Sequence, residues 1–86
     1  MPEEILLTFP ATRAAIAGER ALLAAGLSVK VMPMPEILSA QCGIVLRLPP
    51  EELEAGREIL QAAEVVIAAA YRKAGDDLLD ISDLLC

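Results

Sequence analysis

Two thiols, those of Cys42 and Cys86, are the side chains of this sequence best suited to covalent chemistry. A thiolate is a strong nucleophile, and its sulfur can hold a further sulfur or selenium atom. Histidine is absent, which excludes Cys-His and Ser-His-Asp catalysis and every metal site that needs imidazole. Two cysteines alone are a poor zinc set. We therefore expect no metal and no cofactor, and any chemistry to depend on an activated cysteine.

The two cysteines stand in different local sequences. Cys42 precedes Gly43, which has no side chain and would let a partner approach the sulfur closely. The alternative is that Cys42 is a small buried apolar residue, as many cysteines are. Cys86 is the terminal residue, and nearby carboxylates disfavour its thiolate. It is therefore a candidate resolving thiol or an incidental exposed cysteine. The carboxylates are those of Asp76, Asp77, Asp80 and Asp83.

The composition indicates one small domain. The chain has 86 residues, 56% of them hydrophobic, and a formal charge of -6. An acidic surface repels nucleic-acid phosphates and anionic membranes, and two aromatic residues offer little to stack on bases. No apolar run approaches the length of a membrane span, and the acidic start does not resemble a signal peptide. The sequence therefore predicts a cytoplasmic protein that binds neither nucleic acid nor membrane.

Apolar patterning and the proline and glycine positions define the elements. Alternation or short apolar runs predict strands over residues 5–9, 27–32, 43–48 and 65–72. An Ala- and Leu-rich segment predicts a helix over residues 11–25, which Gly26 ends. Pro49 and Pro50, followed by two glutamates, predict the start of a second helix that runs to about residue 63.

This order predicts an α+β fold of the ferredoxin-like βαββαβ type. It has a four-stranded antiparallel sheet with two helices on one face, formed by a single domain over residues 1–75. Residues 76–86 form an acidic, amphipathic C-terminal tail, with Leu78, Ile81 and Leu85 at helical spacing. We expect the tail to pack against the open sheet face, where Leu6, Val45 and Val66 would otherwise be exposed.

The predicted topology places Cys42 beside the start of the first helix. The first strand ends where that helix begins, and the third strand starts at the same end of the sheet. Cys42 would then lie near Thr12 and Arg13, where backbone N–H groups and the positive end of the helix dipole gather. Such surroundings favour the thiolate.

Three other charged residues are weaker candidates. Glu19 falls among apolar residues of the first helix, so it is either a general base or, as we favour, a structural carboxylate with a partner. Lys30 and Arg47 point to the open sheet face. They could receive an anion together, although solvated surface charges are the more common case.

A wider pattern of residues resembles the selenium/sulfur (Se/S) carrier-like family of small bacterial domains. The resemblance runs from about residue 5 to residue 48 and less distinctly to residue 71. The residues that carry it are Phe9, Thr12, Ala15, Glu19, Leu22, Ala25, Gly26, Val29, Lys30, Pro33, Pro35, Ser39, Cys42, Gly43 and Arg47. It implies that Cys42 is the sulfur- or selenium-carrying residue, with Gly43 and Thr12 as its neighbours.

Three functions follow from these observations. The favoured one is a carrier that holds a sulfane sulfur or selenium on Cys42 and passes it to a partner protein. One alternative is a non-catalytic interaction or oligomerisation module, with a homodimer as one form. The other is a redox-sensing thiol that forms a Cys42–Cys86 bridge under oxidant. The sequence thus favours a carrier or binding domain over a stand-alone enzyme.

Overall fold

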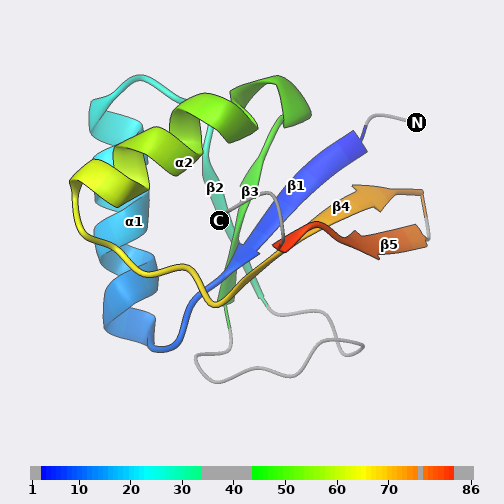
Figure 1. The fold of residues 1–86 in the computed structure, drawn as a ribbon, viewed down its shortest axis with the longest axis horizontal. Coiled ribbons are helices and arrows are strands. Elements are labelled where there is room, and N and C mark those ends of the chain that lie inside the picture. Colours follow the sequence, from blue (N-terminus) through cyan, green and yellow to red (C-terminus); the bar gives the residue numbers. More distant parts are fainter. Residues whose placement is uncertain (1–2, 34–43, 76, 83–86) are drawn as a thin grey trace.

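Five antiparallel strands form one sheet, and two helices cover one of its faces (Figure 1). The computed structural model describes residues 3–33, 44–75 and 77–82. The strand order is β2-β3-β1-β4-β5. Along the chain the elements are β1 (Glu3–Thr8), α1 (Thr12–Ala24), β2 (Lys30–Pro33), β3 (Ile44–Leu48), a short 3-10 helix η1 (Pro50–Glu52), α2 (Leu53–Ala62), β4 (Ala69–Ala74) and β5 (Asp77–Asp80).

The predicted α+β class is confirmed, and so is the predicted order of the six elements β1-α1-β2-β3-α2-β4. The predicted four-stranded ferredoxin-like sheet is wrong. A fifth strand, β5, lies where the helical spacing of the tail had indicated an amphipathic segment. Gly75 at φ +63° forms the turn, and β5 then pairs with β4 from Ala74↔Asp77 to Tyr71↔Asp80. The element order is therefore βαββαββ.

Two predicted strands begin later than the sequence pattern indicated, because the helix ends before them are closed by extra hydrogen bonds. After α1, the Leu27 N–H donates to the Leu22 carbonyl at 3.1 Å, so β2 starts at Lys30. After α2, the Val65 N–H donates to the Leu60 carbonyl at 2.9 Å. Residues 65–68 then cross from the helix layer to the sheet, and β4 starts at Ala69 rather than at residue 65.

The core lies between the sheet and the two helices. Alternate residues of β1 and β3 supply Ile5, Leu7, Leu46 and Leu48, and the helices supply Ala15, Leu22 and Leu60. Two glycines let the helices pack closely. A Cβ on Gly56 would lie 3.0 Å from Leu48 Cδ1, and one on Gly18 would lie 3.3 Å from both Leu60 and Phe9. Side chains at these positions would force the neighbours apart.

The sheet face opposite the helices also contains buried apolar residues. Leu6 and Val45 alternate with the core residues of β1 and β3, and both are fully buried. Val66, which we expected on the same face, instead lies before β4 and is 67% exposed. Among the described residues, neither helix is long and apolar enough to cross a membrane.

Candidate functional site

The end of the sheet where β3 begins is also the end where α1 begins. Thr8, the last residue of β1, pairs with Val45, and Ile44 at the start of β3 pairs with Pro33. Four residues after Thr8 the chain enters α1 at Thr12. The predicted juxtaposition of the third strand's start with the first helix's start is therefore present in the fold.

Thr12 and Arg13 are the first two residues of α1, and both are exposed. Ala11 is the N-cap, in an extended conformation, and its side chain makes no capping bond. No acidic residue lies in the first turn, so the positive end of the helix dipole is reinforced by Arg13 rather than neutralised by a carboxylate.

The other predicted site residues lie outside the part of the chain that the structure describes. They are Cys42, Gly43 and Cys86. The sequence places Cys42 two residues before Ile44, the first residue of β3. The structure thus gives the framework at this end of the sheet, and the cysteine assignments remain predictions.

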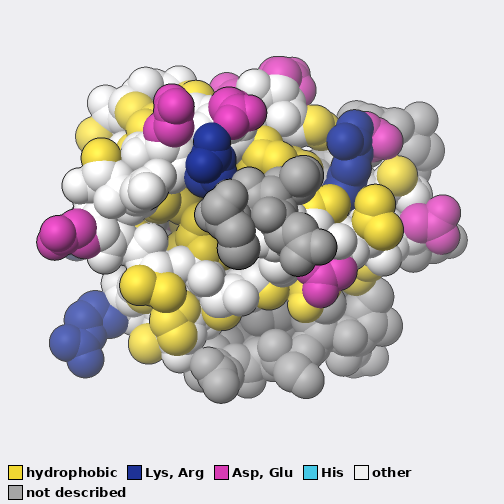
Figure 2. Space-filling model, viewed as in Figure 1, with side chains coloured by type: hydrophobic (Ala, Val, Ile, Leu, Met, Phe, Trp, Pro, Cys, Tyr) yellow, Lys and Arg dark blue, Asp and Glu magenta, His cyan; other side chains and the backbone are white. Residues whose placement is uncertain are grey.

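An apolar hollow of about 410 Å³ lies beside the start of α1. One wall is the first turns of α1, and the other is the chain that leads from α2 toward β4. Figure 2 shows hydrophobic side chains gathered over this part of the molecule. The hollow could not be expected from the sequence pattern, which assigned residues 65–68 to a strand. Its lining residues are Pro10, Ala11, Arg13, Ala14, Ala17, Ala63, Glu64, Val65 and Val66.

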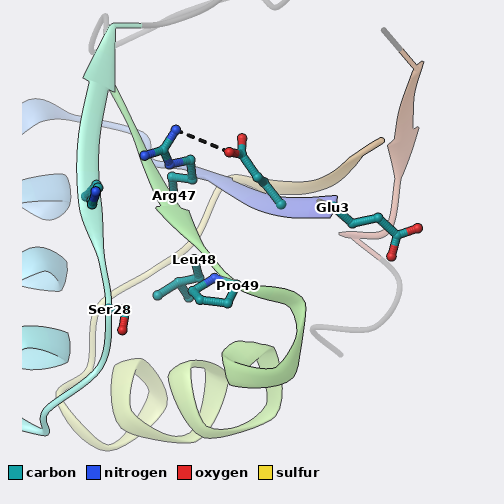
Figure 3. A pocket seen from close by; sticks show the side chains of 7 residues that line it. Glu3, Ser28, Arg47, Leu48 and Pro49 are labelled. Atoms are coloured by element: carbon teal, nitrogen blue, oxygen red, sulfur yellow. Dashed lines mark hydrogen bonds and ion pairs between the residues drawn. The ribbon is translucent and has the colours of Figure 1, made fainter. Parts of the chain in front are cut away.

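A second pocket, of about 250 Å³, lies at the opposite end of the sheet (Figure 3). Lys30 and Arg47 line it and are direct cross-strand partners. Arg47 Nη1 lies 3.2 Å from Glu4 Oε1, and both side chains are about 30% exposed or less. The charge of Arg47 is therefore already matched by a carboxylate, which weakens the interpretation of this pair as an anion site.

Glu19 is half-buried rather than enclosed in an apolar stripe. The buried residues of α1 are Ala15, Gly18 and Leu22, whereas Ile16 is 42% exposed. The buried face of α1 is therefore rotated away from the apolar face expected from the sequence, which included Ile16 and Glu19. In the described ranges, no group of three or more Cys, Asp or Glu side chains could hold a metal ion.

The chain belongs to the putative Se/S carrier protein-like family, whose model matches residues 4–72. The match confirms the family resemblance read from the sequence, and it extends from β1 through most of β4. No curated protein and no solved structure matches the chain.

Proposed function

We propose that this chain is a carrier that holds a sulfane sulfur or a selenium atom on Cys42 and passes it to a partner protein. The observation that carries the proposal is the family match over residues 4–72, which includes Cys42. The chemistry needs one reactive thiol and little else.

Loading would occur by thiol–persulfide exchange. The Cys42 thiolate attacks the outer sulfur of a donor persulfide, R–S–SH. A new S–S bond forms on Cys42, the donor S–S bond breaks, and its electron pair leaves on the donor thiolate, R–S⁻. Selenium would be transferred in the same way from R–S–SeH. Because the donor supplies the oxidised atom, the exchange needs no separate oxidant, and delivery is the same exchange in which an acceptor thiolate attacks the Cys42-bound atom.

The start of α1 supports this role electrostatically. Arg13 is exposed in the first turn, and the first turn has no acidic residue. This helix start stands at the sheet end where β3 begins, two residues after Cys42 in the sequence. We expect the helix dipole and Arg13 to stabilise a Cys42 thiolate and the equally anionic persulfide.

The test is the intact mass of the full chain after incubation with glutathione persulfide, followed by removal of the reagent without reductant. We expect a gain of about 32 Da, one sulfur atom, mapped to Cys42. With selenite and glutathione the expected gain is about 80 Da for one selenium atom. The Cys86→Ser variant should load normally, and the Cys42→Ser variant should not.

Two results would overturn the proposal. One is loading that is unchanged in Cys42→Ser, which would assign the chemistry to Cys86. The other is a loss of about 2 Da with a Cys42–Cys86 bridge and no retained adduct, which is the behaviour of a redox-sensing pair.

A further inference from the structure

The outer surface of the helix layer carries two rows of opposite charge. Arg13 and Arg20 lie seven residues apart on α1, and Glu54 and Glu58 lie one turn apart on α2. Glu54 already pairs with Arg57 of its own helix at 2.7 Å, so Glu58 is the carboxylate of this pair that remains for a partner. All four residues are exposed. They stand opposite the buried residues of their helices, so they point away from the sheet. Each molecule therefore presents a basic row and an acidic row side by side.

The two rows run antiparallel and in register. Gly18 of α1 packs against Leu60 of α2, and Leu22 packs against Gly56. Moving forward four residues in α1 thus corresponds to moving back four residues in α2. Arg20 is midway between Gly18 and Leu22, and Glu58 is midway between Gly56 and Leu60. Arg20 and Glu58 therefore lie at the same height along the helix pair.

A two-fold axis parallel to the helices, above the line between them, uses this register directly. Rotation about this axis does not change the position of any residue along the helix direction, and it places α1 of one copy over α2 of the other. Arg20 then meets Glu58 of the partner subunit, and the two-fold repeats the contact. Within one chain neither residue belongs to the three ion pairs found among the described residues, so both charges are available.

A second pair of opposite charges, Arg13 and Glu64, lies at one end of the helix pair. Arg13 and Glu64 line the same hollow and so lie at the same end of the helix pair. Glu64 adopts φ +60°, a left-handed conformation that glycine would adopt without strain. In the two-fold arrangement Arg13 meets Glu64 of the partner subunit.

Apolar and small side chains complete the surface. Ile16 and Leu23 flank the arginine row and are 42% and 51% exposed. On α2 the exposed Ala55 and Ala62 leave room beside the glutamate row. Their burial would add hydrophobic stabilisation to the ion pairs.

From these observations we propose that the outer faces of α1 and α2 form a two-fold interface between two copies of this chain. The interface is independent of the proposed Cys42 chemistry.

The test is sedimentation equilibrium of the full chain over a range of concentrations. We expect a monomer–dimer equilibrium. Reversing one row with Arg20→Glu, or the other with Glu58→Arg, should weaken the dimer at least tenfold. These exposed positions should not alter folding, which circular dichroism checks. The control is Lys30→Glu on β2, which changes the net charge as Arg20→Glu does and should leave the dimer unchanged.

Restoration of the dimer is the decisive outcome. The double variant Arg20→Glu/Glu58→Arg should dimerise like the native chain, since each charge again meets its opposite. An equimolar mixture of the two single variants should also dimerise, for the same reason. A chain that stays monomeric at every concentration overturns the proposal. So does a dimer that the two charge reversals do not weaken, because its interface would lie elsewhere.

Discussion

Glu64 ends α2 in the same left-handed backbone conformation in which Gly26 ends α1. Their φ values are +60° and +85°. In both helices the next residue's N–H reaches back five residues, from Val65 to Leu60 and from Leu27 to Leu22. The two helix ends are thus alike, but only α1 uses the residue that accepts this conformation without strain.

We therefore predict that Glu64→Gly stabilises the folded chain by about 1 kcal/mol. The measurement is urea-induced unfolding at a protein concentration low enough for the chain to be monomeric. The matched control is Gly26→Ala, which should cost about 1 kcal/mol. No atom lies within 4 Å of a Cβ at Gly26, so that cost reports backbone strain alone. A Glu64→Gly variant no more stable than the native chain would show that this glutamate makes a compensating contact.

Ile81 lies just beyond β5 yet belongs to the main core. It is 9% exposed, and its N–H donates to the Ala70 carbonyl at 2.9 Å. We predict that Ile81→Ala lowers the free energy of unfolding by about 2–4 kcal/mol. The control is Leu79→Ala on β5, where the side chain is 62% exposed and the expected change is below about 0.5 kcal/mol. Equal losses in the two variants would contradict this difference.

Residues 77–82 also show where sequence patterning reaches its limit. Leu78 and Ile81 are three residues apart, a spacing that a helical turn and a strand with its exit can both accommodate. Pairing with β4 makes this segment a strand rather than a helix. That pairing depends on the turn at Gly75 and on the free edge of β4, which is held in the sheet by its pairing with β1. By contrast, β1 was predicted from a short apolar run that Pro10 ends, and β3 from the alternation of its residues, so local pattern alone was enough for both strands.

The site was predictable to a similar extent. Strand order alone brings the starts of β3 and α1 together, so the positions of Thr12 and Arg13 could be predicted from the sequence. The pairing of Arg47 with Glu4 could not, because it depends on the register between β1 and β3. The left-handed Glu64 was also invisible, since its residue type gives no signal for that conformation.

Asp80 should make the stability of the chain depend on pH. The Ser82 side chain, and then the Ser82 N–H at 2.9 Å, donate hydrogen bonds to its carboxylate and lower its pKa below the usual value. A carboxyl whose pKa is depressed in the folded state contributes stability above the unfolded-state pKa of about 3.9. That contribution is lost as the pH falls through the folded-state pKa. The stability advantage of the native chain over Asp80→Asn should therefore shrink on acidification.

Thermal unfolding of the two proteins between about pH 6 and about pH 2 measures this difference. Asp77→Asn, on the same strand, is the control for removing one negative charge without losing the Ser82 contacts. A gap between native chain and Asp80→Asn that stays constant or widens at low pH would contradict the prediction.

The reactivity of the two cysteines provides the last prediction. In the sequence Cys42 stands two residues before β3. That strand begins at the sheet end where α1 starts, with Arg13 and no acidic residue in its first turn. Four aspartates stand among the ten residues before Cys86 in the sequence. We therefore expect Cys42 to be the more reactive thiol, with an apparent pKa below the free-cysteine value of about 8.5. Surrounding negative charge should hold the pKa of Cys86 above that value.

Alkylation by iodoacetamide as a function of pH tests this directly. Cys86→Ser retains only Cys42, and Cys42→Ser retains only Cys86, so each variant reports one thiol. The rate for Cys86→Ser should reach its plateau at a lower pH, because the reactive species is the thiolate. A Cys42 thiol that titrates above about 8.5, or that reacts only when urea unfolds the chain, would be a poor carrier of sulfur or selenium. That result would leave the interface between the helix layers as the better account of what this chain does.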